Sequence, residues 1–121
     1  MVKKKLLIVD DEPDILQLLE KRFKKNNFDV LTADNGQKCL DIASQEQPDL
    51  IILDIIMPFL DGYEVIEKLR TNLKTKQIPI IMHSVKKESR SIFKSLDLGS
   101  IDYVINPASF DDLLKVVNRY V

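Results

Sequence analysis

Short apolar runs alternate along this chain with longer segments in which apolar residues recur every three or four positions. The runs occupy residues 6–9, 30–31, 50–53, 80–82 and 103–105, and the wider spacing is clearest at 15–23, 65–69 and 113–117. These two patterns are typical of strands and helices, respectively. Because strands that alternate with helices are joined by crossovers, the pattern predicts a parallel sheet, and strands that are apolar on both faces need helices on both sides. The predicted fold class is α/β.

Two predicted helix starts carry a side-chain signal. Asp61 is followed three positions later by Glu64, and Ser109 by Asp112, and both pairs match the reciprocal capping box. The 121 residues contain no Pro- or Gly-rich linker, repeat or low-complexity tract, and the length suits one domain. We therefore expect a single domain over residues 1–121.

Composition excludes several classes of protein. With 45% hydrophobic and 31% charged residues, three Gly and five Pro, the chain is neither disordered nor collagen-like. The 18 basic and 19 acidic side chains leave a net charge of -1, which argues against direct nucleic-acid binding. The first apolar run ends at Asp10, too early for a signal peptide, and no run could span a bilayer. The single Cys39 cannot form an internal disulfide and is expected to pack in a helix, so we expect a cytoplasmic protein without a membrane partner.

Polar residues directly follow most of the predicted strands. They are Asp10 and Asp11, Asp54, His83 and Ser84, and Asn106. In an open parallel sheet, ligands bind beyond the carboxyl ends of the strands, so these side chains would share one rim. If the first and third strands are neighbours at the usual spacing of about 4.8 Å, the three aspartates converge.

Converging carboxylates need a compensating interaction. Two such charges about 4 Å apart repel by roughly 4 kcal/mol at an effective dielectric constant of about 20, a large fraction of a small domain's stability. Protonating one carboxylate or binding a cation would offset the repulsion, and a cluster of oxygen ligands suits Mg²⁺. Because Mg²⁺ often shares its ligand shell with a phosphate and a carboxylate can form an aspartyl-phosphate, phosphoryl chemistry is the working hypothesis.

Several of these residues also have a structural interpretation. Asp11 precedes an acidic residue and a proline and, on its own, is better explained as the cap of the first helix. Ser84 is equally well explained as the start of a helix, and His83 is better explained as a packed or hydrogen-bonded strand residue than as a ligand. Asp54 differs from these, because a carboxylate between apolar residues is not expected to serve structure alone.

Together these residues resemble the receiver domain of two-component response regulators. The resemblance covers the whole chain and is carried by LIVDDEP at 7–13, LDIIMP at 53–58, DGYE at 61–64, PIIMHS at 79–84 and DYVINP at 102–107. It implies a flavodoxin-like, doubly wound five-stranded parallel sheet in the order 2-1-3-4-5 with five helices. It also implies two-component signal transduction, in which a sensor histidine kinase or phosphotransfer protein donates a phosphoryl group.

The resemblance also implies roles for individual residues. Asp54 would be the phosphoacceptor, Asp11 a direct Mg²⁺ ligand, and Asp10 a residue that acts largely through a bound water. The backbone carbonyl of Ile56 would complete the protein's share of the metal site.

The resemblance further implies a switch and shows two departures from the family pattern. Ser84 would bond the phosphoryl oxygen and Tyr103 would swing inward with it, although packing explains an aromatic at the start of an apolar strand equally well. Asn106 stands where the family has a lysine that pairs with the phosphoryl group, and an amide carries no charge. Val85, which follows the serine, is larger than usual and is expected to narrow access. The Asn106–Pro107 bond would be cis.

We expect a stand-alone switch rather than an enzyme. Phosphorylation of Asp54 with Mg²⁺ would change affinity for a downstream protein target, and a homodimer is an open alternative. A degenerate receiver that acts as a phosphorylation-independent interaction module is the alternative, with Asn106 as its evidence. A phosphohydrolase is disfavoured because Ile56 stands where those enzymes carry a second aspartate. A basic face is expected on the fourth helix, more often solvated than an interaction surface, from Lys86, Lys87, Arg90 and Lys94.

Overall fold

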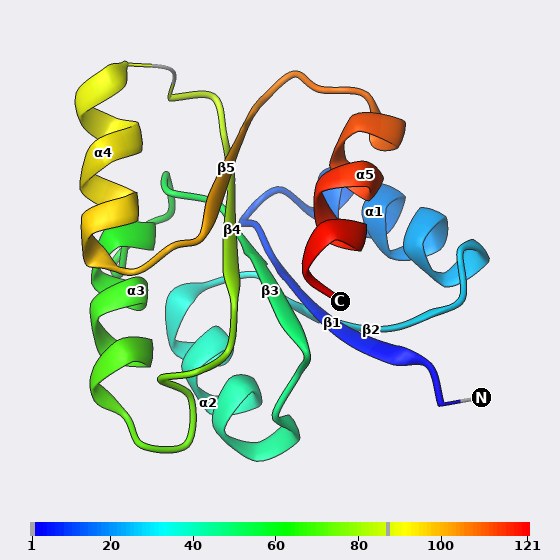
Figure 1. Cartoon of the computed structure of the whole chain (residues 1–121), viewed down its shortest axis with the longest axis horizontal. Helices are drawn as coiled ribbons and strands as arrows, with labels where there is room; N and C mark the ends of the chain where they lie inside the picture. Colours follow the sequence, from blue (N-terminus) through cyan, green and yellow to red (C-terminus); the bar gives the residue numbers. More distant parts are fainter. Residues whose placement is uncertain (1, 87) are drawn as a thin grey trace.

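A computed structural model describes residues 2–86 and 88–121 (Figure 1). In these residues five strands alternate with five helices. The strands are β1 (Lys4–Val9), β2 (Phe28–Ala33), β3 (Leu50–Leu53), β4 (Ile80–Ser84) and β5 (Asp102–Ile105). The helices are α1 (Pro13–Lys25), α2 (Gly36–Glu46), α3 (Gly62–Thr71), α4 (Ser89–Leu98) and α5 (Phe110–Tyr120). The strands form one parallel sheet in the order β2-β1-β3-β4-β5, which confirms the fold that the resemblance implied.

The register of the sheet brings the carboxyl ends of β1 and β3 together. Val9 pairs with Ala33 of β2 on one side and with Leu53 of β3 on the other. The chain direction across the sheet reverses at this point, which is where open α/β sheets leave a ligand-binding crevice. All five predicted runs fall within strands. β2 is longer than its predicted run because it is an edge strand, where a solvent-exposed residue such as Asp29 interrupts the apolar pattern.

Helices cover both faces of the sheet, as predicted. Figure 1 shows α1 and α5 together on one face and α2, α3 and α4 on the other. On the first face the fully buried ring of Phe23 packs edge-on against Phe28 and Phe110, with centroids 5.5 and 4.9 Å away. On the second face Cys39 is fully buried among apolar side chains, as expected, and burial raises the pKa of its thiol to about 12.

Side chains cap helix starts at the two predicted positions, but only one forms the full capping box. Asp61 accepts from the Glu64 amide at 3.0 Å, and Glu64 accepts from the Asp61 amide at 3.3 Å. At α5, Ser109 accepts from the Asp112 amide at 3.1 Å, but no returning bond from Asp112 occurs among the described residues. The reciprocal prediction is wrong there because an aspartate is one methylene shorter than the glutamate or glutamine of the motif.

Arg70 on α3 links three segments of the chain. Its guanidinium donates to the Gly99 carbonyl from Nε at 3.1 Å and from Nη2 at 2.8 Å. It also donates from Nη1 to the carbonyls of Lys76 at 3.0 Å and Ile78 at 2.8 Å. The acceptors lie in the α3–β4 and α4–β5 connections, so the fork of Arg70 fixes both connections against α3.

The expected basic face of α4 is only partly present. The helix begins at Ser89, so Lys86 precedes it, and Lys87 lies outside the described residues. Lys94 does lie on α4, but its Nζ is 4.3 Å from the centre of the Tyr63 ring, a cation–π contact with α3.

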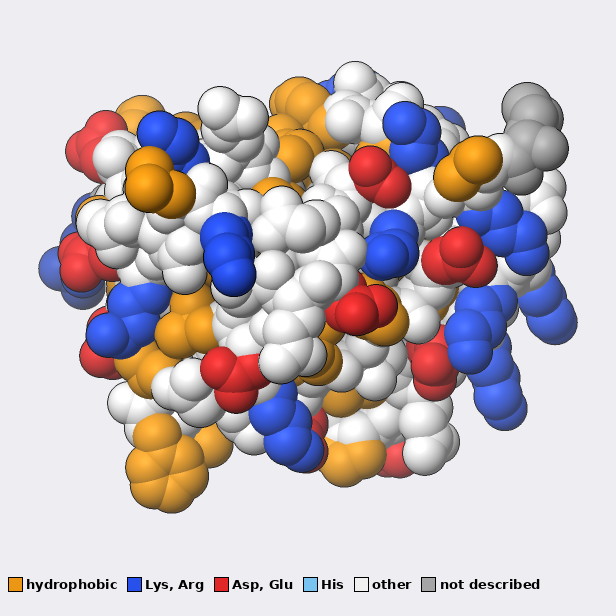
Figure 2. All heavy atoms as spheres, turned by 90° about the horizontal axis from the view of Figure 1, so that it is seen from below, with side chains coloured by type: hydrophobic (Ala, Val, Ile, Leu, Met, Phe, Trp, Pro, Cys, Tyr) orange, Lys and Arg blue, Asp and Glu red, His pale blue; other side chains and the backbone are white. Residues whose placement is uncertain are grey.

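Charges of both signs are mixed on the molecular surface. Figure 2 shows Lys and Arg side chains interspersed with Asp and Glu over the face seen from below, with hydrophobic side chains in small groups. Within the described part of the chain, every helix is too short or too polar to cross a membrane.

Candidate functional site

Asp10 and Asp54 extend from the carboxyl ends of two adjacent strands. The Asp54 amide donates to the Val9 carbonyl at 3.1 Å, which continues the β1–β3 ladder beyond the strands. One carboxylate oxygen from each of Asp10, Asp11 and Asp54 lies within 4.8 Å of the other two. The predicted convergence of the three aspartates is therefore confirmed.

The loop after β1 separates the roles of its two aspartates. Asp10 is 4% exposed, and its Oδ1 accepts from the Glu12 amide at 2.9 Å. Glu12 is the N-cap residue of α1 and makes no side-chain cap bond. The interpretation of Asp11 as the helix cap is wrong, because Asp10 binds the amide at the start of the helix and Asp11 remains exposed beside the other two carboxylates.

Burial makes the acidic cluster hard to ionise completely. Burial is the main cause that raises the pKa of Asp10 to about 6. The hydrogen bond from the Glu12 amide lowers this pKa, and the charges of Asp54 and Asp11 raise it. Burial also raises the pKa of Asp54, and the backbone amides of Ile56 and Ile55 and the Ser84 hydroxyl partly offset this. All three side chains offer oxygen, the donor that a hard cation such as Mg²⁺ prefers, and a bound cation would favour the ionised forms. The donor set therefore fits Mg²⁺.

Asp54 begins a tight loop between β3 and α3 that requires glycine. Asp54 Oδ1 accepts from the Ile56 amide at 3.3 Å, so this carboxylate has a backbone partner within its own loop. The Gly62 amide donates to the Ile55 carbonyl at 2.8 Å. A Cβ on Gly62 would lie 2.5 Å from the Asp54 carbonyl oxygen and 2.6 Å from Ile55 Cα. Gly62 belongs to the DGYE motif, but no local signal in the sequence indicates that this close approach fixes the backbone of Asp54.

Ser84 and Tyr103 connect the cluster with the start of the β4–α4 connection. Ser84 is the last residue of β4 and is 1% exposed, so its interpretation as a helix start is wrong; α4 begins later, at Ser89. The Oγ of Ser84 accepts from the Lys86 amide at 3.3 Å, and the Ser84 hydroxyl lowers the pKa of the neighbouring Asp54. The hydroxyl of Tyr103 donates to the Lys86 carbonyl. Burial raises the pKa of Tyr103, and the nearby Ser84 hydroxyl opposes this.

Asn106 and the three aspartates line the same cavity, which has a volume of about 170 Å³. Asp54, Ile56, Val85 and Asn106 all line it, together with the aspartates that follow β1. Val85 is 58% exposed, so it borders the cavity from the solvent side. The Asn106–Pro107 peptide bond is cis, as the resemblance implied.

Asn106 has a neighbour that the sequence analysis did not pair with it. His83 is 6% exposed, and the nearby Asn106 side chain raises the pKa of its imidazole against burial, which lowers it more. This agrees with the interpretation of His83 as a packed residue, and its polar neighbour comes from the end of β5. The signal was the presence of polar residues at the ends of two strands, but only the pairing of β4 with β5 makes them neighbours.

The match to a known family covers nearly the entire chain. The profile described as "Response regulator receiver domain" matches residues 6–118. The chain belongs to this family. It is therefore a receiver domain of two-component signalling, as the motifs at the strand ends suggested.

Similar proteins agree with this assignment. The receiver is 39% identical over 113 residues to a "Probable transcriptional regulator ycf27" of Porphyridium aerugineum. It is 41% identical over 108 residues to the "Alkaline phosphatase synthesis transcriptional regulatory protein PhoP" of Bacillus subtilis (strain 168). These matches cover 93% and 89% of this chain but 46% and 44% of the relatives, so the receiver spans less than half of their length.

Solved structures share the fold of this receiver. The chemotaxis protein CheY4 of Vibrio cholerae superimposes with a TM-score of 0.94 at 27% identity, covering 99% of this chain and all of the other. The BeF3-activated N-terminal receiver domain of Klebsiella pneumoniae RstA superimposes with a TM-score of 0.89 at 26% identity, covering 97% of both chains.

Proposed function

We propose that this receiver accepts a phosphoryl group on Asp54 and thereby changes its affinity for a partner protein. The single observation that carries the proposal is the convergence of Asp10, Asp11 and Asp54 within 4.8 Å at the rim of the sheet. Asp54 is the member of this cluster whose pKa the neighbouring Ser84 hydroxyl lowers, and the same hydroxyl lowers the pKa of Tyr103. A change at Asp54 therefore has a direct route to the β4–α4 connection.

The reaction transfers a phosphoryl group from a nitrogen atom of the donor to a carboxylate oxygen of Asp54. An Oδ of ionised Asp54 attacks the phosphorus of a phosphohistidine, the P–N bond breaks, and the released imidazole nitrogen takes up a proton. The product is an acyl phosphate on Asp54, with the phosphoryl group in the cavity that Asn106 lines. Asp10, Asp11, Asp54 and the backbone carbonyl of Ile56 would hold Mg²⁺, whose positive charge would offset the negative charge of the carboxylates and the phosphoryl group.

The switch uses residues that are already connected. The oxygens of a phosphoryl group on Asp54 are hydrogen-bond acceptors, and the Ser84 hydroxyl can donate to one of them. Such a bond would direct the Ser84 hydroxyl from Asp54 itself to the phosphoryl group, and a movement of Ser84 would disturb the bond that its Oγ accepts from the Lys86 amide. The phenol of Tyr103 and the Lys86 carbonyl would then rearrange, which changes the surface next to α4.

The proposal places this chain between two kinds of protein. A sensor histidine kinase or phosphotransfer protein supplies the phosphoryl group, and a downstream protein binds the altered surface. The near-neutral net charge favours protein partners over direct nucleic-acid binding, with a homodimer as a further possibility, and the site of action is the cytoplasm. The chain acts as a signalling module rather than as an enzyme with a separate substrate.

Asn106 is the only feature in favour of a phosphorylation-independent module among the residues described. An amide cannot form the ion pair that a lysine would make with a phosphoryl group. It can still donate hydrogen bonds to phosphoryl oxygens, and it lines the same cavity as Asp54. We therefore favour the switch.

Phosphorylation can be tested by intact mass. The purified receiver is incubated with Mg²⁺ and acetyl phosphate, beside Asp54→Asn and Asp41→Asn, the latter removing a carboxylate from the exposed face of α2. We expect one added phosphoryl group on the wild type and on Asp41→Asn, and none on Asp54→Asn. No addition to the wild type, or equal addition to Asp54→Asn, would contradict the proposal.

A further inference from the structure

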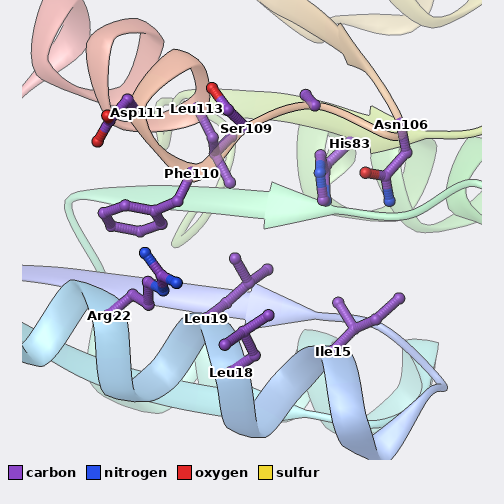
Figure 3. A pocket seen from close by; sticks show the side chains of 11 residues that line it. Ile15, Leu18, Leu19, Arg22, His83, Asn106, Ser109, Phe110, Asp111 and Leu113 are labelled. Carbon is purple, nitrogen blue, oxygen red and sulfur yellow. The ribbon is translucent and has the colours of Figure 1, made fainter.

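His83 and Asn106 form a polar pair between two cavities. Figure 3 shows their side chains next to each other at one end of a cavity that α1 and α5 enclose. This cavity has a volume of about 410 Å³ and is lined by both residues. Asn106 also lines the smaller cavity that Asp54 lines, so this residue borders both spaces.

A backbone hydrogen bond fixes the main chain of Asn106 but leaves its side chain free to rotate. Its amide donates to the Ser84 carbonyl at 2.7 Å, which extends the pairing of β4 with β5 by one residue. This bond fixes the main chain of Asn106 but not the rotation of its carboxamide. The oxygen and nitrogen ends of a carboxamide have almost the same size, so packing alone distinguishes them poorly.

His83 is a polar residue at a position of β4 that faces an apolar cluster. Side chains alternate along β4: Ile81 belongs to the apolar cluster beneath α1 and α5, Met82 to the cluster on the other face, and His83 returns to the first. A buried imidazole on an apolar face needs a hydrogen-bond partner, and Asn106, which lies next to it and raises its pKa, is the polar neighbour that can serve as one.

The imidazole sets the direction of the carboxamide. Burial lowers the pKa of His83 and outweighs the opposing effect of Asn106, which favours the neutral ring with its one N–H donor. Figure 3 shows the Asn106 oxygen turned toward the imidazole and the nitrogen turned away from it. The N–H of His83 therefore takes the acceptor end of the amide and leaves both hydrogens of the NH₂ group free for other acceptors.

We propose that His83 is a positioning residue, which orients the carboxamide of Asn106 so that its NH₂ group donates to the phosphoryl group transferred to Asp54. The inference rests on the proposed function, because it needs a phosphoryl group in the cavity. In the transfer, the Asp54 oxygen bonds to phosphorus, and the bond from phosphorus to the leaving atom of the donor breaks. The phosphoryl oxygens only accept hydrogen bonds, so an inverted amide would point its own oxygen at them and repel them. The His83–Asn106 pair thus supplies a directed dipole where the family has a lysine.

The test is a double-mutant cycle on the rate of phosphorylation by acetyl phosphate with Mg²⁺. His83→Leu keeps the volume and removes the donor, His83→Gln keeps a donor, and each is made with Asn106 intact and with Asn106→Ala. We expect His83→Leu to lower the rate about fivefold, the effect of one neutral hydrogen bond, and His83→Gln to recover most of it. In the Asn106→Ala background, His83→Leu should change the rate less than about twofold, because there is no carboxamide left to orient.

The outcomes separate this inference from the proposed function. If the wild type is not phosphorylated, both are overturned. If the wild type is phosphorylated on Asp54 and His83→Leu reacts at the same rate, or is slowed equally in both backgrounds, only the role of His83 is overturned.

A second measurement does not depend on a folded His83→Leu variant. In the wild type, the side-chain NH₂ signals of Asn106 should shift when beryllofluoride and Mg²⁺ are added, and they should not shift in Asp54→Asn. Signals that remain unchanged in the wild type would also overturn the inference.

Discussion

Replacing Asp10 with asparagine should stabilise the metal-free receiver at neutral pH. The side chain of Asp10 is almost completely buried and lies beside two other carboxylates. An asparagine keeps an oxygen in position to accept from the Glu12 amide, which Asp10 Oδ1 now binds at 2.9 Å, but it removes the charge. The variant therefore relieves the burial of a charge while leaving the local hydrogen bond intact.

The magnitude follows from the pKa of Asp10. Its pKa is about 6 in the folded protein and 3.8 ordinarily, and each pH unit corresponds to about 1.4 kcal/mol. The ionised carboxylate thus lowers the free energy of unfolding by up to about 3 kcal/mol. A chain of this length gains about 4 °C in Tm per kcal/mol, so the variant should melt about 5–12 °C higher at pH 7.

The pH dependence has a definite sign. Between about pH 4 and pH 6 the folded state keeps a proton on Asp10 that the unfolded chain has released, so wild-type stability falls as the pH rises through this window. Asparagine has no such proton. The advantage of Asp10→Asn should therefore be absent near pH 3.8, grow up to about pH 6 and remain constant above it.

The assay is urea or thermal unfolding at pH values from 4 to 7 in EDTA. Asp29→Asn is the matched control, because it removes the same charge from an exposed position on β2 and should change stability by less than about 0.5 kcal/mol at every pH. Added Mg²⁺ should stabilise the wild type more than Asp10→Asn and reduce their difference. A variant no more stable than the wild type at pH 7 without metal, or an advantage equal at pH 4 and pH 7, would refute the reasoning.

Four further substitutions test contacts described above. Gly62→Ala should cost more than about 2 kcal/mol in urea unfolding and weaken Mg²⁺ binding by calorimetry, because its Cβ meets the Asp54 backbone at 2.5 Å; wild-type behaviour in both would show that the loop can yield. Arg70→Ala should cost about 2–4 kcal/mol, since three backbone carbonyls lose a charged donor; a loss below about 0.5 kcal/mol would mean that water replaces it. Ser109→Ala should lower the free energy of unfolding by about 1 kcal/mol, because it removes the cap of α5. Asp112→Ala should lower it less, since Asp112 makes no returning bond among the described residues; a larger loss for Asp112→Ala would indicate that both bonds of the capping box form there.

Much of the secondary structure and part of the candidate site could be predicted from local sequence signals. The apolar run at residues 50–53 coincides with β3, because a strand buried on both faces has no polar residue to blur its ends. The capping box of Asp61 and Glu64 is equally local, since its bonds span only three residues. Prediction was weaker at the sheet edge, where only the two end residues of β2 are buried, and at α1, where a buried Asp10 rather than Asp11 binds the Glu12 amide.

Other features depended on contacts between segments that are distant in sequence. No local pattern indicates that Arg70 reaches the Gly99 carbonyl, because the two residues are brought together only when α3 packs beside α4. The pairing of His83 with Asn106 likewise exists only because β4 and β5 are neighbours in the sheet.

The sequence by itself determined which residues form strands and helices and which polar residues end the strands, because periodicity and capping act over a few positions. The tertiary structure alone decided which of those ends meet. Strand order and register put Asp10 beside Asp54, and the burial that results raises the pKa of both carboxylates. Aspartates so far apart along the chain acquire a shared chemistry only when the free energy of folding holds their charges together in a place that water cannot fully reach.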